Sequence, residues 1–139
     1  SMESRVENAA ERHKSGYNCS QAVVCTYCDL LGIEEQAAFR MSEGFGAGMG
    51  NMESTCGALS GAVMLAGLKS SDGCLEAPKT KGKTYQLAKE IARRFKEQCG
   101  YSVCREIKGV GTGTAKYGCR DCVRAAAAIA EEVLFGENA

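Results

Sequence analysis

The stretch that decides the fold runs from residue 54 to residue 68 and reads S-T-C-G-A-L-S-G-A-V-M-L-A-G-L. Its side chains are apolar or small at nearly every position, so an α-helix built from it has no polar face. A helix that is hydrophobic on all sides has to be surrounded by other elements. We therefore predict that this segment is the central buried helix, and that its glycine and alanine residues let neighbouring backbones approach closely.

The rest of the chain is typical of an all-α protein. Ala, Glu, Lys and Leu are plentiful, alternating β-branched residues are scarce, and Pro78 is the only proline. Further helical patterns lie at residues 3–14, 19–31, 34–42, 83–99, 102–108 and 119–135. A chain of 139 residues can bury one core without disulfides. We expect a single-domain bundle of about five to seven helices over residues 2–139, with Ser1 left out as a remnant of tag removal.

The charge balance disfavours two classes of partner. Seventeen basic residues balance seventeen acidic ones without a long run of one sign, so neither a nucleic-acid stripe nor a membrane patch is indicated. The longest apolar run, residues 57–68, is shorter than the ~20 residues that cross a bilayer, and no basic-then-apolar leader precedes the domain. We expect a cytoplasmic protein that binds no nucleic acid and does not insert into membranes. Association into a homo-oligomer is left open.

Cysteine is the unusual component, with nine of 139 residues. In a reducing compartment this density favours metal ligation or thiol redox chemistry over a framework of disulfides. The odd number leaves at least one thiol unpaired. The alternative is that many of the thiols only fill the core, because free cysteine is among the most buried residue types.

Cys56 is the cysteine at which structure and chemistry coincide. It lies in the first turn of the predicted central helix, where unpaired N–H groups and the helix dipole favour the thiolate and lower the pKa. Burial in an apolar core acts in the opposite direction and raises the pKa of a cysteine. The sequence leaves both outcomes open.

Three other cysteines stand near predicted helix starts. Asn18 can cap the helix that begins at Cys19. Cys19 and Cys119 fall on the inward faces of their helices, and Cys104 stands beside a glycine-containing loop. Together with Cys56 they form four thiols on four segments that can converge at one end of a bundle. Such a site suits an iron–sulfur cluster or zinc, both of which take four thiolates.

The remaining cysteines have simpler interpretations. Cys25 and Cys28 project from the polar side of their predicted helix, which favours two exposed thiols over half of a four-cysteine metal site shared with Cys19. A surface loop carries Cys74, and Cys99 continues an apolar helix stripe.

Cys122 lies at the margin of the inward face of the last helix, and its role is left open. His13, the only histidine, lies in the polar last turn of the first helix, where interaction with the helix dipole is the ordinary role. His13 is not expected in the site.

A glycine run, G-F-G-A-G-M-G at residues 44–50, precedes the central helix. Alternate glycines indicate close backbone approach or positive φ. The run can cradle an anion or a cluster with its N–H groups, or simply connect two helices tightly, and both alternatives stay open. It is not a dinucleotide-binding fingerprint, because no strand precedes it.

Four short motifs carry a resemblance to a known family. G-Y-N-C (16–19), C-G-A-L-S-G (56–61), C-R-E-I-K (104–108) and C-x-x-x-V (119–123) resemble the signature of the C_GCAxxG_C_C family of redox-active proteins, which are small cytoplasmic bacterial and archaeal domains. Related domains occur alongside haem in some cytochromes, where an iron–sulfur role has been proposed. The resemblance covers about residues 16–135, and Cys122 stands at an apolar position of the family pattern. It implies redox chemistry or cluster binding rather than a particular reaction.

Three hypotheses follow for function. The first is electron transfer or sensing by an iron–sulfur cluster held by Cys19, Cys56, Cys104 and Cys119, with a redox partner protein that the sequence does not identify. The second is a metal-free thiol–disulfide relay in which Cys56 attacks and one of the other three resolves. The third is a structural zinc site or a plain helical interaction module. Hydrolase chemistry is not expected, because no general acid–base constellation is present.

Overall fold

The structure is a computed structural model and describes residues 2–115 and 117–136. Within these ranges it contains seven α-helices and no β-strand, which confirms the all-α bundle. The helices are α1 (Val6–Lys14), α2 (Cys19–Tyr27), α3 (Glu35–Ser42), α4 (Gly57–Ser70), α5 (Lys81–Cys99), α6 (Cys104–Ile107) and α7 (Cys119–Leu134). Ser1, interpreted from the sequence as a tag remnant, lies outside the described residues.

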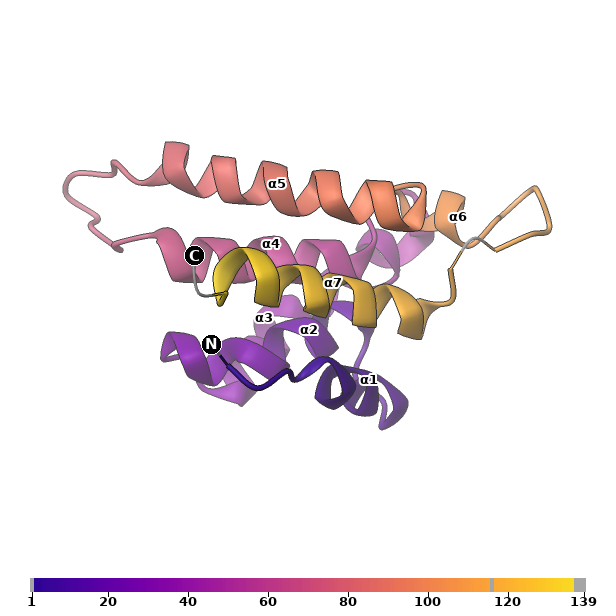
Figure 1. Cartoon of the computed structure of the whole chain (residues 1–139), viewed down its shortest axis with the longest axis horizontal. Helices are drawn as coiled ribbons and strands as arrows, with labels where there is room; N and C mark the ends of the chain where they lie inside the picture. Colours follow the sequence, from indigo (N-terminus) through magenta and orange to yellow (C-terminus); the bar gives the residue numbers. More distant parts are fainter. Residues whose placement is uncertain (1, 116, 137–139) are drawn as a thin grey trace.

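The central helix is α4, as the sequence predicts. It runs beside α5 and α7, and α2 packs against it from the other side, where α1 and α3 complete the bundle (Figure 1). Ala58, Ala62, Leu65 and Ala66 of α4 are fully buried in the core. The apolar stretch therefore occupies the place where most of the other long helices meet.

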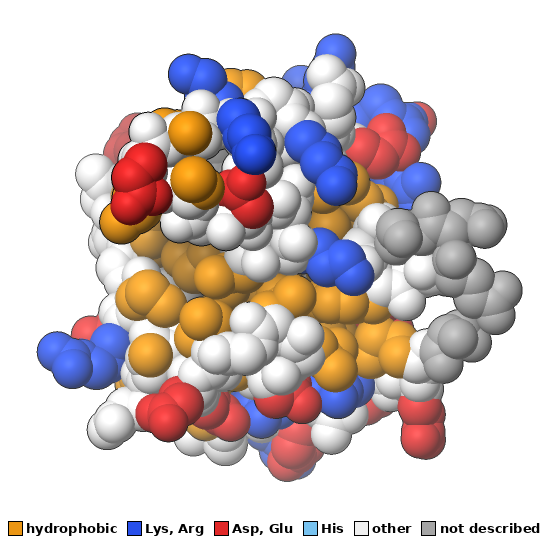
Figure 2. Space-filling view, turned by 90° about the vertical axis from the view of Figure 1, so that its left-hand side faces the viewer, with side chains coloured by type: hydrophobic (Ala, Val, Ile, Leu, Met, Phe, Trp, Pro, Cys, Tyr) orange, Lys and Arg blue, Asp and Glu red, His pale blue; other side chains and the backbone are white. Residues whose placement is uncertain are grey.

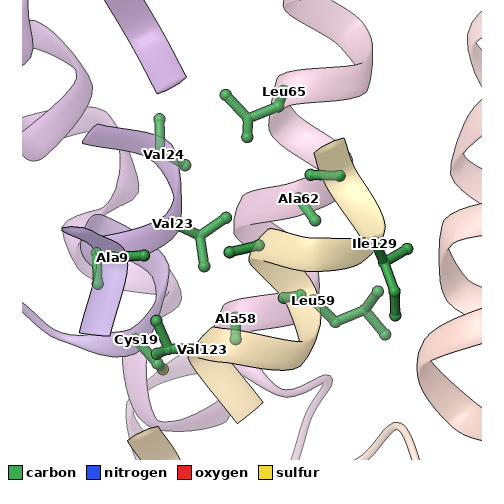
Figure 3. Packing of buried hydrophobic residues seen from close by; sticks show 14 of the residues in the cluster. Ala9, Cys19, Val23, Val24, Ala58, Leu59, Ala62, Leu65, Val123 and Ile129 are labelled. Carbon is green, nitrogen blue, oxygen red and sulfur yellow. The ribbon is translucent and has the colours of Figure 1, made fainter. Parts of the chain in front are cut away.

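Small residues on α4 allow this close packing. A Cβ added at Gly61 would lie 2.9 Å from the backbone oxygen of Ser20 and 3.3 Å from Cβ of Val23, so α2 can approach only because Gly61 has no side chain. Figure 3 shows side chains of α2 and α7, among them Val23 and Val123, gathered around the small residues Ala58 and Ala62 of α4. Interiors at this density leave little room for an extra methyl group.

One side of α4 is less covered than the sequence predicts. Val63 and Met64 are only partly buried. Together with Phe45, Ala88 and Ala92 they line an open, mainly apolar groove between α4 and α5. The helix is therefore enclosed by α2, α5 and α7, and its fourth side is half-exposed.

The start of α4 differs from the prediction by three residues. The helix begins at Gly57, and the residues before it are held in an extended conformation by the segment that precedes α6. The N–H of Cys56 donates to the carbonyl oxygen of Ser102 at 2.7 Å, and the N–H of Cys104 donates to that of Ser54 at 2.9 Å. These two bonds remove the segment from the helix and bring Cys56 and Cys104 to the same end of the bundle.

The prediction that Cys25 and Cys28 are exposed is wrong. Each is about 2% exposed, and every residue of α2 is buried. The face of α2 that the residue pattern assigns to solvent is covered by α3, whose Glu35 carbonyl lies 3.7 Å from the Cys25 sulfur. Burial raises the pKa of Cys25 to about 12, so both residues are core thiols.

Cys74 lies in the connection between α4 and α5, at the opposite end of the bundle from α6 (Figure 1). It is partly exposed, in agreement with the predicted surface loop. Figure 2 views the molecule from that end and shows a band of hydrophobic side chains between charged ones. In the part of the chain that the structure describes, no helix combines the length and hydropathy that a membrane span requires.

Candidate functional site

Five cysteines line one cavity of about 170 Å³ at the end of the bundle where α2, α4, α6 and α7 begin. They are Cys19, Cys56, Cys104, Cys119 and Cys122. The structure thus brings together the four thiols that the sequence singles out, and it adds a fifth. The other residues of the cavity wall are His13, Asn18, Ala47, Ile107, Lys108 and Tyr117.

Local capping fixes the first of these thiols. The side-chain oxygen of Asn18 accepts from the N–H of Gln21 at 2.9 Å, and the Gln21 side chain accepts from the N–H of Asn18 at 2.9 Å. This reciprocal capping box satisfies two N–H groups at the start of α2. It sets the orientation of the first turn, and with it the position of Cys19.

Glycines make room for the sulfur atoms. A Cβ at Gly57 would lie 2.5 Å from the sulfur of Cys19, and a Cβ at Gly48 would lie 2.5 Å from Cβ of Cys104. Gly48 also has a φ of +55°, which side chains rarely adopt. The glycine run therefore connects α3 to α4 tightly around the thiols, and the backbone of Ala47 in that run offsets part of the rise in the pKa of Cys19 that burial causes.

Three thiols form a continuous chain into the core. Cys56 and Cys122 lie together in the cavity wall, and Cys99 neighbours Cys122 on its inner side. Interaction with Cys56 lowers the pKa of Cys122, but interaction with Cys99 and burial outweigh it and raise that pKa to about 12. Interaction with Cys122 lowers the pKa of Cys99 at the inner end of the chain. Cys56 and Cys122 are therefore placed for chemistry with each other.

The structure resolves the open question about Cys56. Its interaction with Cys122 and its burial raise the pKa of Cys56 well above the usual range. The N–H groups of Ala58 and Leu59 at the start of α4 act in the opposite direction but do not compensate. Cys56 is therefore a thiol at neutral pH, and activation by the helix start does not make it the first nucleophile.

Positive charge gathers at the cavity. Lys108 lines the cavity with Cys119, and interaction with Cys119, followed by the nearby Cys104 and Cys19 sulfurs, raises the pKa of Lys108. Arg120 donates to Nδ1 of His13, which also lines the cavity, at 3.2 Å. Burial, followed by the charges of Arg120 and Lys108, lowers the pKa of His13. Lys108 therefore supplies a fixed cation beside the thiols.

A single metal ion does not fit this arrangement of donors. Among residues 2–115 and 117–136, no three His, Cys, Asp or Glu side chains are grouped as a metal ion requires. The thiols of Cys19, Cys56, Cys104 and Cys119 line one cavity but do not form such a group. The donor type is still the soft thiolate that iron–sulfur clusters take.

Three functional candidates escaped the sequence interpretation. Cys122 is 3% exposed and lies in the cavity wall. The signal for it was present in the C-R-D-C spacing of residues 119–122 at the start of a helix, because C-x-x-C motifs at helix starts are typical of redox thiols. No sequence pattern assigned a site role to Lys108 or His13, because only the tertiary fold places them at the cavity.

The fold and the cavity define a class: a cysteine-rich, all-α protein whose thiols meet where four helices begin. The chain belongs to the C_GCAxxG_C_C family, described as "Putative redox-active protein (C_GCAxxG_C_C)", and the match covers residues 17–133. The resemblance predicted from the cysteine motifs is thereby confirmed. No curated protein and no solved structure matches the chain.

Proposed function

We propose that the chain is a thiol-based redox protein in which Cys56 and Cys122 form a reversible disulfide. The observation that carries this proposal is that the two thiols line the same cavity wall and lie close enough for each to shift the pKa of the other. Membership of a family described as redox-active supports the same class of chemistry.

The reaction balances with a disulfide as oxidant. The thiols of Cys56 and Cys122 lose two electrons and two protons as their S–S bond forms. A substrate disulfide takes up both and leaves as two thiols, and in the reverse direction a partner dithiol reduces the protein. This proposal revises the predicted relay, because Cys122 takes the place of Cys19, Cys104 or Cys119 as the resolving thiol.

Cys99 also contacts Cys122, but it is the less suitable partner. It lies at the inner end of the thiol chain and does not line the cavity, whereas Cys56 does. An exchange reaction requires access for the attacking sulfur and an exit for the leaving thiol. Both are available on the cavity side of Cys122.

A redox titration tests the proposal. The protein is equilibrated without oxygen in dithiothreitol buffers of graded potential, quenched with acid, and alkylated after unfolding for mass analysis. We expect nine alkylated thiols to fall to seven in one two-electron step, with a tenfold change in ratio for every ~30 mV. Loss of no thiols, or of two thiols that involve neither Cys56 nor Cys122, would contradict the proposal.

Matched cysteine variants identify the pair. Cys122→Ala should abolish the step, and Cys56→Ala should change its potential, because Cys122 can then pair only with another thiol; Cys74→Ala and Cys99→Ala should leave the step unchanged. Far-UV circular dichroism of each reduced variant verifies that it is folded. A step of unchanged potential in folded Cys56→Ala would assign the disulfide elsewhere.

A second candidate function uses the same cavity. We propose as the alternative that Cys19, Cys56, Cys104 and Cys119 hold an iron–sulfur cluster for electron transfer or sensing. It is supported by the four thiols that begin four helices around one space, and by Lys108 and the Ala47 N–H group, which offset thiolate charge. Such a cluster would supply one-electron chemistry when bound.

Reconstitution distinguishes the two candidates. Reduced protein is incubated anaerobically with ferrous iron and sulfide, desalted, and assayed for iron, sulfide and visible absorption. Near-stoichiometric iron and sulfide that are lost in Cys19→Ala, but not in Cys25→Ala, would establish the cluster. Retention of no iron, together with the two-thiol step described above, would leave the metal-free function. Zinc added in place of iron tests the structural zinc alternative by the same metal assay.

A further inference from the structure

We propose that Cys119 is the thiol that attacks the substrate, and that the substrate is a small disulfide carrying carboxylate groups. This inference rests on the proposed function, because the oxidising equivalents that Cys119 receives are passed to Cys122 and Cys56. It assigns a residue and a substrate class to the cavity.

Exposure selects Cys119 among the cavity thiols. Cys19, Cys56, Cys104 and Cys122 are buried, whereas Cys119 is partly exposed. It is the first residue of α7, and Cys122 follows one helical turn later on the same helix. Residues three apart on a helix lie on the same face, so a disulfide captured by Cys119 comes within reach of Cys122. An outer attacking thiol and an inner resolving thiol at a helix start form a complete exchange site.

The charge of the cavity selects the substrate. Lys108 and Cys119 line the same cavity, and so does His13, whose Nδ1 accepts from Arg120 at 3.2 Å. Among the described residues that line the cavity there is no Asp or Glu. The neighbouring carboxylate of Asp121 lies outside the wall and is held by Arg124 at 3.1 Å. A carboxylate-bearing disulfide therefore meets unopposed positive charge beside the attacking sulfur.

The cavity volume limits the size of the substrate. A space of about 170 Å³ accommodates a group of the size of one or two side chains, but not a folded polypeptide surface. The half of the substrate that enters is thus a small thiol fragment. The other half remains at the rim beside Tyr117 and His13, which also line the cavity.

The exchange steps conserve atoms and electrons. The Cys119 thiolate attacks one sulfur of R–S–S–R, forms a Cys119–S–S–R mixed disulfide and expels R–S⁻, which takes a proton. Cys122 gives up its proton, attacks the Cys119 sulfur and expels the second R–S⁻. Cys56 then gives up its proton, attacks the Cys122 sulfur and releases Cys119 as a thiolate. The net change is one substrate disulfide reduced to two thiols and one Cys56–Cys122 disulfide formed.

Three small disulfides of different charge test the inference: 3,3′-dithiodipropionate (anionic), bis(2-hydroxyethyl) disulfide (neutral) and cystamine (cationic). Each is mixed with reduced Cys122→Ala protein, in which resolution by Cys122 is blocked. The mixed disulfide is measured over time by mass analysis of the tryptic peptide 117–120, which contains Cys119 alone. We expect the anionic probe to react ~10-fold faster than the cationic one at low salt.

The protein carries its own control thiol. Cys74 is also partly exposed, but its sulfur lies 4.0 Å from the carboxylate of Glu76. It should show the opposite order of rates. Lys108→Gln should bring the ratio at Cys119 towards one, whereas Lys83→Gln, at the far end of α5, should leave it unchanged.

Several results would overturn the inference. These are a mixed disulfide at Cys74 but none at Cys119, equal rates for the three probes at Cys119, or a preference that Lys108→Gln does not alter.

The wild-type protein supplies a second measurement if Cys122→Ala does not fold: brief exposure to the anionic probe should label peptide 117–120 before any internal disulfide accumulates. Capture at Cys119 without a Cys56–Cys122 link would support the attacking thiol and contradict only the proposed function. If diamide forms a Cys56–Cys122 disulfide but Cys119 reacts with none of the three probes, the proposed function is supported and the assignment of Cys119 as the attacking thiol is contradicted.

Discussion

Gly57→Ala tests whether the start of α4 is packed as tightly as the structure shows. The added Cβ would lie 2.5 Å from the Cys19 sulfur, 2.7 Å from the carbonyl oxygen of Phe45 and 3.1 Å from Cα of Gly46. The thiol can rotate away, but the carbonyl oxygen belongs to the backbone and cannot. Overpacking of this kind costs about 1–3 kcal/mol.

A smaller effect acts in the opposite direction. Alanine is a better helix former than glycine by up to about 1 kcal/mol in a helix interior, and by less at the first helical residue. The net destabilisation of Gly57→Ala should therefore be about 1–2 kcal/mol, which for a domain of this length lowers the Tm by about 3–8 °C. Thermal unfolding of the reduced protein, followed by circular dichroism, measures this shift.

Gly67→Ala is the matched control. It makes the same change in the same helix, but nothing lies within 4 Å of the added Cβ. Only the propensity gain remains, so its Tm should rise slightly. A Gly57→Ala protein as stable as Gly67→Ala would refute the close contact between α4, the glycine run and Cys19.

Three further predictions concern the thiols and the ionisable groups. Iodoacetamide at neutral pH should modify only Cys74 and Cys119 quickly in the native reduced protein, because the other seven cysteines are buried; labelling of Cys25 as fast as that of Cys74 would show that α3 does not cover α2. The single histidine should titrate below its usual pKa of 6.5 in an NMR experiment, because burial and Arg120 lower the pKa of His13. The unfolded chain therefore binds a proton at His13 more readily than the folded protein does, so the contribution of His13 to stability decreases as the pH falls through 6.5. A His13 pKa at or above 6.5 would contradict the geometry. The hydrogen bonds from Arg12 and Tyr17 lower the pKa of Glu35 below 4.5, so their stabilisation is present at neutral pH and is lost as the pH falls through the lowered value. Arg12→Met should therefore reduce the free energy of unfolding at pH 7 by no more than about 1 kcal/mol, because the Arg12–Glu35 pair is partly exposed. The same substitution should have a smaller effect at pH 3. An equal loss at both pH values would assign the effect to packing.

The sequence predicts the fold well because its strongest signal is a single apolar segment. The apolar stretch at residues 54–68 predicts a central helix, which α4 forms from Gly57 onward, and the amphipathic patterns around it supply the helices that cover it. The exact start of α4 could not be predicted, because it depends on a long-range hydrogen bond between Cys56 and Ser102. The prediction that Cys25 is exposed failed for a similar reason. A helical pattern does not reveal that a short neighbouring helix, α3, covers the polar side of α2.

The candidate site was predictable in outline but not in detail. The inward phase of Cys19 and Cys119 and their positions at helix starts were enough to predict that thiols converge. The approach of Cys56 and Cys122 depends on how α4 and α7 pack, which the residue pattern of either helix alone does not specify. The placement of Lys108 and Cys119 at one cavity likewise depends on tertiary packing.

Disulfide mapping of the oxidised protein tests the central claim most directly. Trypsin cleaves after Arg120, so it separates Cys119 in peptide 117–120 from Cys122 in peptide 121–124, while Cys56 lies in peptide 41–69. After oxidation by a small disulfide and acid quenching, we predict that the dominant linked species joins peptide 41–69 to peptide 121–124. Oxidised protein in which peptide 121–124 remains free, or is linked only to a segment other than 41–69, would contradict the account.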